Sequence, residues 1–179
     1  MIIQMAGLPG TGKSTLARAL ATELSAVVLD KDDVRHALFS TAVAYTRDQD
    51  DFCVRLLFEA AAWLLDHGQP MVILDGRTCS RHYQVDQVRD FARRHAQRLV
   101  IIECVCPEPT VRARLANDDG HPAANRDFAL YRRLRDAAEP IEAPKLTIDT
   151  GADLADALTR CLGALSDTVA CLQTHWSAV

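Results

Sequence analysis

Residues 7–14 read Gly-Leu-Pro-Gly-Thr-Gly-Lys-Ser and match the pattern G-x-x-x-x-G-K-[ST] in full. Glycines at three of these positions let the backbone turn its N–H groups towards one point, where they form an anion-binding nest. The apolar run before the motif predicts a strand, and the leucine spacing after it predicts a helix whose positive end faces the same point. A loop in this setting binds the phosphates of a nucleotide.

The motif gives each of its residues a role. Lys13 reaches the β- and γ-phosphates and takes part in catalysis, and the hydroxyl of Ser14 is a ligand for Mg²⁺. ATP and Mg²⁺ are therefore the expected cofactors. Nucleotide contacts are expected along the whole loop: Gly7, Leu8, Pro9, Gly10, Thr11, Gly12, Lys13, Ser14 and Thr15. A glycine-rich turn that contains Lys-Ser by chance is the alternative, and the flanking strand and helix argue against it.

A second group of charged residues, Asp30-Lys31-Asp32-Asp33-Val34-Arg35, follows the next predicted strand. Positions three apart in a helix share a face, so Asp32 and Arg35 can converge on one ligand. Phosphoryl transfer to a hydroxyl needs a carboxylate that accepts the proton and a cation that holds the acceptor. We therefore expect Asp32 to be the general base and Arg35 to bind the acceptor. Capping of the helix by Asp32 or Asp33 is the alternative, and a cap at Asp33 is compatible with both roles.

The third predicted strand ends at Asp75, directly before Gly76-Arg77-Thr78. A carboxylate at the end of an apolar strand beside the phosphate loop is the usual second ligand, often through water, for the Mg²⁺ on Ser14. We expect Asp75 to have this role. Arg77, Thr78 and Arg81 are expected to contact the acceptor, with ordinary loop polarity as the alternative.

Arginines also border a weakly patterned stretch, residues 117–125, which we expect to form the centre of a mobile lid over residues 112–130. A basic flap that closes over the phosphates excludes water and stabilises the charge of the transition state. Arg114 and Arg126 are the expected phosphate contacts. Because Arg112 and Arg114 are two apart on a helix, at most one of these two points at the phosphates.

Five apolar runs alternate with helical patterns along the chain. The expected strands are residues 1–6, 26–30, 70–75, 98–106 and 145–149, and the expected helices are residues 13–24, 32–39, 47–67, 81–95, 107–117, 126–139 and 153–175. This alternation is typical of an α/β fold with a parallel sheet covered on both faces. Such a fold places every functional loop at the carboxyl edge of the sheet.

The length of 179 residues fits a single domain, residues 1–179. The net charge of −4 does not indicate a general affinity for nucleic acid or membranes, although residues 77–98 and 112–135 carry six arginines each. The N-terminus has no basic leader before an apolar segment, so we expect a cytoplasmic protein with no membrane association. Nothing indicates an obligate protein partner. The six cysteines include no C-x-x-C pair and are expected to pack in the core as reduced thiols.

At this point the chain resembles the small P-loop kinases, an ATP-binding group that includes polynucleotide 5′-kinases, chloramphenicol phosphotransferase-like proteins and adenylylsulfate kinases. Residues 7–15 look like their nucleotide loop. Asp32-Asp33-Val34-Arg35 is similar to the D-x-x-R of polynucleotide kinases, in which the Asp is the general base and the Arg organises the acceptor phosphate. Residues 29–38 also resemble the L-D-G-D-N-V-R segment of adenylylsulfate kinases, and Glu142-Ala-Pro and Ile148-Asp-Thr resemble their Y-E-x-P and l-D-T.

The sequence also departs from these families. Adenylylsulfate kinases carry R-D-P-K-G-L-Y directly after the helix that matches residues 107–114, whereas here Arg126-Asp-Phe-Ala-Leu-Tyr comes later and lacks the Lys and the Gly. This difference argues against adenylylsulfate as the acceptor. Polynucleotide kinases place a second lid Arg where this chain has Asp118, so the lid contact has moved to Arg126 or has been lost.

The resemblance implies a three-layer P-loop NTPase fold with strand order 2-3-1-4-5 and a small lid. It also implies an ATP- and Mg²⁺-dependent phosphotransferase that acts on a hydroxyl of a small molecule or of a nucleic-acid end. Two alternatives stay open. A polynucleotide 5′-hydroxyl kinase proper needs a basic channel, against which the overall acidity argues. A regulatory ATPase without a second substrate would not need the Asp32–Arg35 pair.

Overall fold

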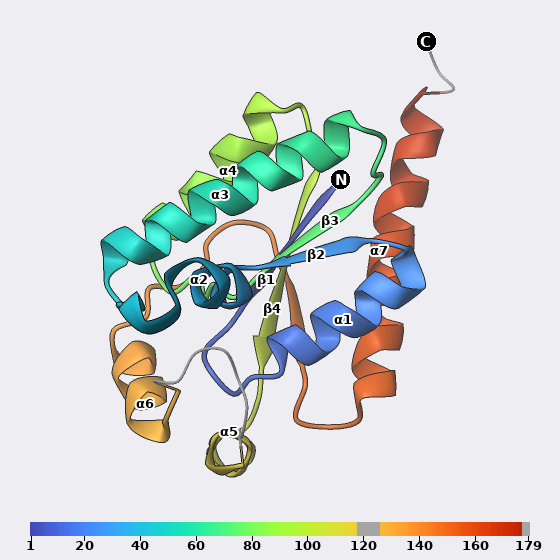
Figure 1. The fold of residues 1–179 in the computed structure, drawn as a ribbon. Coiled ribbons are helices and arrows are strands. Elements are labelled where there is room, and N and C mark those ends of the chain that lie inside the picture. Colours follow the sequence, from blue (N-terminus) through green and yellow to red (C-terminus); the bar gives the residue numbers. More distant parts are fainter. Residues whose placement is uncertain (118–125, 177–179) are drawn as a thin grey trace.

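The apolar run before the phosphate loop forms the central strand of the sheet. The computed structural model describes residues 1–117 and 126–176, with side chains up to residue 166. Its five strands form one parallel sheet in the order β2-β3-β1-β4-β5, which confirms the predicted fold and strand order (Figure 1). The strands are β1 (Ile2–Ala6), β2 (Val27–Asp30), β3 (Val72–Asp75), β4 (Leu99–Val105) and β5 (Leu146–Asp149).

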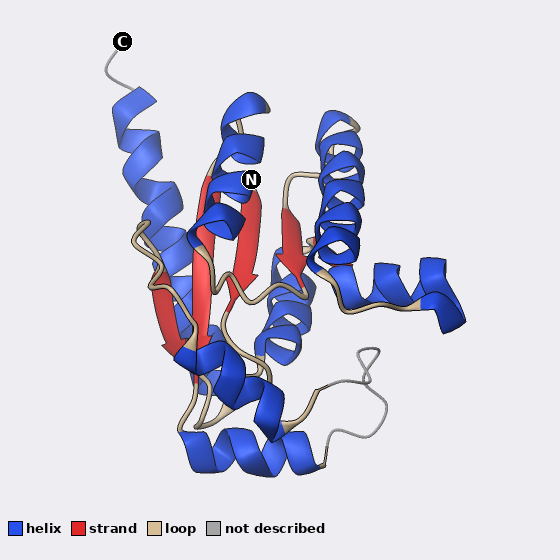
Figure 2. Cartoon of the chain, turned by 90° about the vertical axis from the view of Figure 1, so that its left-hand side faces the viewer, coloured by secondary structure: helices blue, strands red, loops and turns tan. Residues whose placement is uncertain are grey.

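Helices cover both faces of this sheet, with α1 and α7 on one side and α3 and α4 on the other (Figures 1 and 2). Neighbouring side chains of β1 alternate between the two layers: Ile3 packs in the cluster with α1 and α7, and Ile2 in the cluster with α3 and α4. The helices are α1 (Lys13–Leu24), α2 (Lys31–Phe39), α3 (Arg47–Asp66), α4 (His82–Arg94), α5 (Glu108–Ala116), α6 (Phe128–Asp136) and α7 (Leu154–Trp176), with a short 3₁₀ helix η1 (Ser40–Ala42).

Most predicted element ends lie within two residues of the observed ones, and two differences affect the site. β2 continues into α2 without a loop, so Asp30 caps the helix and accepts a hydrogen bond from the N–H of Asp32 at 2.8 Å. The alternative interpretation, a cap at Asp32 or Asp33, is therefore wrong, because the cap is Asp30. α6 begins at Phe128 rather than at Arg126, because the side chain of Asp127 caps it.

The helices α5 and α6 lie beyond the carboxyl ends of the strands, beside the phosphate loop (Figures 1 and 2). Their own small core, Val111, Leu115 and Tyr131, packs against Leu8 of the loop. A Cβ atom at Gly10 would lie 2.9 Å from the Cγ atom of Leu115 and 2.9 Å from the Cγ1 atom of Val111. The loop and α5 are thus in direct contact. Residues 118–125, the centre of the predicted lid, lie outside the described residues.

The cysteines in the described part of the chain are free thiols, and four of the five are buried: Cys53, Cys79, Cys104 and Cys161, with Cys106 partly exposed. Core packing of reduced thiols, as predicted, accounts for them; the side chain of Cys171 is outside the described part. A search of the described helices finds none with the length and apolar character to cross a membrane.

Gly7 is a position where the loop tolerates no side chain. Its φ is +127°, and a Cβ atom there would lie 2.3 Å from the carbonyl oxygen of Cys104. We expect Gly7→Ala to lower the free energy of unfolding by about 3 kcal/mol, from backbone strain and overlap with β4. Gly163→Ala is the matched control, because Gly163 lies in α7 with open space around it, and it should raise stability by about 0.5–1 kcal/mol. Urea unfolding of both variants measures the difference, and equal stability of Gly7→Ala and the wild type would contradict it.

Candidate active site

The phosphate loop leads from the end of β1 into the first turn of α1. Lys13 is 9 % exposed, and its Nζ donates to the carbonyl of Leu8 at 2.9 Å. Burial lowers the pKa of Lys13, and the charge of Asp75 counteracts this. No side chain caps α1 and no acidic residue occupies its first turn. The helix therefore directs its first N–H groups and its positive end at an anion in the loop.

Two carboxylates lie side by side at the carboxyl edge, because β2 and β3 pair Asp30 with Asp75 in register. Asp75 is 1 % exposed, and neither of its carboxylate oxygens hydrogen-bonds to a residue that the structure describes. Burial, and then the charge of Asp75, raises the pKa of Asp30 to about 6. A buried carboxylate without a hydrogen bond fits a cation, so Asp75 suits Mg²⁺ bound with Ser14.

The described residues include no cluster of three or more His, Cys, Asp or Glu side chains that could hold a metal ion by themselves. In nucleotide sites Mg²⁺ commonly takes most of its ligands from phosphate and water and only one or two from protein.

The Asp32–Arg35 pair forms as the spacing predicts: Nη1 of Arg35 donates to Oδ1 of Asp32 at 2.9 Å. Asp50 of α3 holds the same group from the other side. Its Oδ1 accepts hydrogen bonds from Nζ of Lys31 at 2.6 Å and from Nη2 of Arg35 at 2.5 Å. Burial alone would raise the pKa of Asp50, but the two cations outweigh it and lower the pKa. Asp50 thus stays ionised and holds Arg35 in place.

The loop after β3 contributes two further arginines. Arg77 is 4 % exposed, and it donates from Nη2 to Oδ1 of Asp51 at 2.6 Å and from Nη1 to Oε1 of Gln87 at 2.7 Å. Arg81 is more exposed, and its Nη1 lies 3.3 Å from Oε1 of Glu139. Arg77 is therefore fixed by α3 and α4, whereas Arg81 is exposed in part and pairs only with Glu139 among the described residues.

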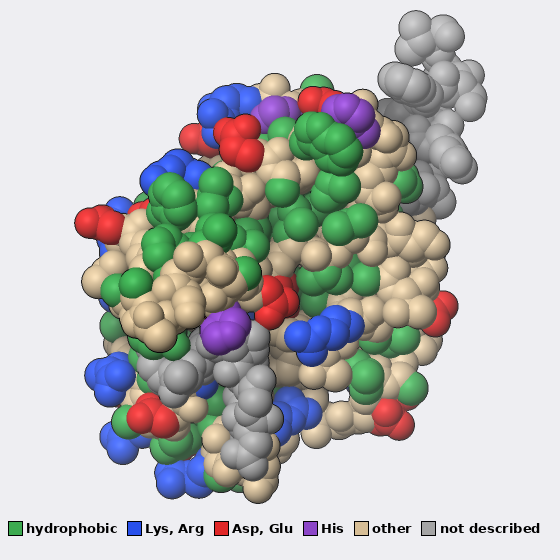
Figure 3. Space-filling model, in the orientation of Figure 1, with side chains coloured by type: hydrophobic (Ala, Val, Ile, Leu, Met, Phe, Trp, Pro, Cys, Tyr) green, Lys and Arg blue, Asp and Glu red, His purple; other side chains and the backbone are tan. Residues whose placement is uncertain are grey.

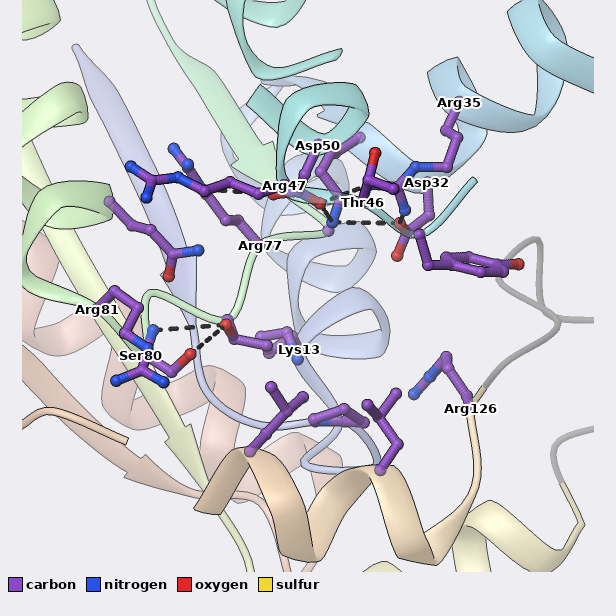
Figure 4. A pocket seen from close by; sticks show the side chains of 18 of the residues that line it. Lys13, Asp32, Arg35, Thr46, Arg47, Asp50, Arg77, Ser80, Arg81 and Arg126 are labelled. Atoms are coloured by element: carbon purple, nitrogen blue, oxygen red, sulfur yellow. Dashed lines mark hydrogen bonds and ion pairs between the residues drawn. The ribbon is translucent and has the colours of Figure 1, made fainter. Parts of the chain in front are cut away.

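A cavity of about 310 Å³ brings the predicted acceptor residues together. Figure 4 shows Lys13 between Asp32, Arg35 and Asp50 on one side and Ser80 and Arg81 on the other. Among the residues that line it are Pro9, Lys13, Ser14, Asp32, Arg35, Arg77, Thr78, Arg81 and Arg126. Every residue predicted to bind the acceptor therefore lines one cavity.

A second cavity, of about 560 Å³, borders the phosphate loop and α5. It is lined by Gly10, Gly12, Lys13, Ser14, Thr15, Arg18, Thr110, Ala113, Arg114, Asn117 and Arg126. Lys13, Ser14 and Arg126 line both cavities. Gly7, Leu8 and Thr11 line neither and instead support the loop: the hydroxyl of Thr11 donates to the carbonyl of Leu8 at 2.7 Å.

The side chains of Arg112 and Arg114 point in different directions, as their helical spacing predicts. Arg112 lies over the ring of Phe128, 3.8 Å from its centroid, while Nη2 of Arg114 donates to the carbonyl of Thr150 at 2.6 Å. Arg114 faces the second cavity, and Arg126 lies where the two cavities meet. Direct contact of Arg114 and Arg126 with phosphates stays a prediction.

Sequence reasoning placed residues 39–47 and 77–83 near the acceptor but gave no role to Lys31 or Asp50 of the first cavity. Lys31 and Asp50 complete the network around Arg35, and Arg47 stacks on the ring of Tyr83 with 4.1 Å to the ring centroid. The acidic first turn of α3 did not reveal the role of Asp50, because acidic residues favour that position whether or not they have a partner. No local pattern links residue 47 to residue 83.

Comparison with known proteins places the chain in a family. The sequence model of the AAA domain family matches residues 2–141, which is most of the chain. The chain belongs to this family, among the small P-loop kinases. The adenylyl-sulfate kinase of Myxococcus xanthus is 30% identical over 162 residues, which cover 87% of this chain and 85% of that protein.

A second relative and a solved structure fit the same group. The probable bifunctional SAT/APS kinase 2 of Sorangium cellulosum is 26% identical over 175 residues, or 93% of this chain, but the chain spans only 28% of the length of that protein. The crystal structure of a gluconokinase from Sinorhizobium meliloti has a TM-score of 0.71 and 18% identity, and the match covers 97% of this chain and 95% of that one. This P-loop kinase fold therefore occurs in proteins named for different acceptors.

The raised pKa of Asp30 makes stability depend on pH. Between pH values near 4 and 6 the Asp30 carboxyl binds more protons in the folded protein than in the unfolded chain, so the contribution of Asp30 to stability falls as the pH rises through this range. We expect Asp30→Asn, which retains a helix cap, to be more stable than the wild type at pH 8 by up to about 3 kcal/mol. Below about pH 4 the variant and the wild type should have the same stability. Urea unfolding without Mg²⁺ at a series of pH values measures this difference in stability. A difference that does not vary with pH would show that the titration of Asp30 does not cause it.

Proposed function

We propose that this P-loop kinase transfers the γ-phosphoryl group of ATP to a hydroxyl of a small anionic molecule bound in the first cavity. The observation that carries the proposal is the pair of cavities that meet at Lys13, Ser14 and Arg126. A transferase with two substrates needs two adjoining sites that share the transferring groups. A regulatory ATPase needs only the second cavity, and the first would then have no use.

On the nucleotide side, the residues of the loop bind and orient the triphosphate. The N–H groups at the start of α1 and the ammonium of Lys13 bind the β- and γ-phosphates. Ser14 and Asp75 would hold Mg²⁺, which when bound neutralises charge between the β- and γ-phosphate oxygens. Arg126 lies where charge builds up between the two substrates, and Arg114 lies beside the nucleotide.

On the acceptor side, Asp32 accepts the proton of the attacking hydroxyl. Its contacts with Arg35 and Lys31 both use Oδ1, which leaves Oδ2 to face the hydroxyl. Arg35 orients the acceptor, and Asp50 holds Arg35 in position. The cavity is rich in Arg side chains that Asp50 and Asp51 neutralise only in part, so a negative charge on the acceptor is favourable.

A small acceptor fits these observations better than a nucleic-acid end. Leu130 and Leu134 of α6 line the same cavity, whose volume is about 310 Å³ and therefore suits a small molecule. On the face that Figure 3 shows, Lys and Arg side chains stand apart from one another among other residues. A strand-binding groove would need a continuous basic path. Polynucleotide 5′-kinase activity is therefore the weaker alternative.

Replacement of Asp32 tests the proposed base. We expect Asp32→Asn to lower kcat by about 10²–10⁴-fold and to leave ATP affinity within a few-fold of the wild type. Asp33→Asn is the control, because Asp33 lies on the exposed side of the same helical turn, and it should leave kcat unchanged. Steady-state kinetics and nucleotide binding measure both effects. Equal losses in the two variants would remove Asp32 from the mechanism.

A panel of acceptors assayed with γ-labelled ATP tests the activity itself. The panel contains adenylylsulfate, gluconate, glycerate, a nucleoside and a 5′-hydroxyl oligonucleotide. We expect label in a small anionic acceptor and none in the oligonucleotide, because the cavity is small and basic. Label that appears only in free phosphate with every acceptor would support the regulatory ATPase instead.

A further inference from the structure

Gln84, in the first turn of α4, is a buried residue whose side-chain oxygen pairs with no residue that the structure describes. Its side chain is 8 % exposed, and its Oε1 is buried without a hydrogen-bond partner among the described residues. Gln4, which is also buried, differs, because its Nε2 donates to the carbonyls of Met5 at 2.8 Å and Leu74 at 3.3 Å. Gln87, one turn further along α4, accepts a hydrogen bond from Arg77.

An unpaired amide oxygen in the interior destabilises the folded protein, because it loses its bonds to water and gains none in return. An apolar side chain of the same length, such as Met, would fill the same space without this cost. Polar groups left unpaired in this way are found where a ligand completes them, at the expense of stability.

The position of Gln84 connects it with the acceptor. It lines the same cavity as Asp32 and Arg35, together with its sequence neighbours Arg81 and Tyr83. Arginines can only donate hydrogen bonds, so they suit the anionic group of an acceptor, whereas Oε1 of Gln84 can only accept one. The cavity thus offers places for two different groups of a single ligand.

We infer that Gln84 determines specificity in the acceptor site: its Oε1 accepts a hydrogen bond from a hydroxyl or amino group of the acceptor other than the hydroxyl that is phosphorylated. This inference rests on the proposed function and narrows the acceptor to a small anion with at least two such groups, of the polyhydroxy-acid type. A site built to bond a substrate hydroxyl discriminates strongly against an analogue that lacks it.

The kinetic test compares Gln84→Met with the wild type, using the panel acceptor that takes most label and its analogue in which one non-reacting hydroxyl is replaced by hydrogen. For glycerate this analogue is 3-hydroxypropanoate. We expect the variant to raise the KM for the acceptor about 10-fold or more, to leave the KM for ATP unchanged, and to lose most of the preference over the analogue. An unchanged acceptor KM and an unchanged preference would overturn the inference while the proposed function stands.

The stability test needs no acceptor. Gln84→Met removes an unpaired oxygen, so its Tm should rise by about 2–4 °C, whereas the matched variant Gln4→Met removes a paired group and its Tm should fall by about as much. A fall in the Tm of Gln84→Met like that of Gln4→Met would show that Oε1 already has a partner, and would overturn the inference. Failure of the wild type to label any acceptor would overturn the proposed function and this inference together.

Discussion

Burial of charge at the carboxyl edge of the sheet is the constraint on which the rest of the site depends. Lys13, Asp30 and Asp75 are each less than a tenth exposed, and an isolated charge in such a place is strongly unfavourable. The strand order lowers this energetic cost, because β1 pairs with β3 and β3 pairs with β2. Three chain segments therefore leave the sheet side by side, and their charges offset one another in part.

The start of α3 balances buried charge in the first cavity in a similar way. Asp50 and Asp51 follow each other there, and each accepts a hydrogen bond from an arginine of a different segment, Arg35 of α2 and Arg77 of the loop after β3. Two long side chains are thereby fixed before any acceptor arrives, so less of their freedom is lost on binding. The acidic turn of α3 organises the basic wall of the cavity without belonging to the phosphate-binding motif.

The parts of this structure that could be predicted from sequence are those set by short spacing. The phosphate loop, the Asp32–Arg35 pair and the divergence of Arg112 from Arg114 each depend on fewer than ten consecutive residues with known local geometry. The parallel order of the strands followed from their alternation with helices and from the family resemblance. The cap at Asp30 was missed because the sequence does not show that β2 enters α2 without a loop.

Contacts between distant segments could not be predicted from the sequence, for a different reason. Lys31 and Asp50 are 19 residues apart, and Arg77 and Asp51 are 26 apart; in both pairs the partner is one of many acidic residues in the chain. The isolation of Oε1 of Gln84 depends on every atom packed around it, so no pattern of residue types could reveal it. Pairings of this kind are decided by tertiary packing rather than by propensity.

The contact between Gly10 and α5 restricts how the loop can evolve. Residue 10 has to suit two neighbours at once, the proposed phosphate site on one side and the side chains of Val111 and Leu115 on the other. Any larger residue there would push α5 outward, and α5 carries Arg114. Two independent requirements therefore restrict the residue at this position. Bulkier side chains at positions 111 and 115 of α5 would also be unfavourable, because they would displace the loop even if the helix itself could accommodate them.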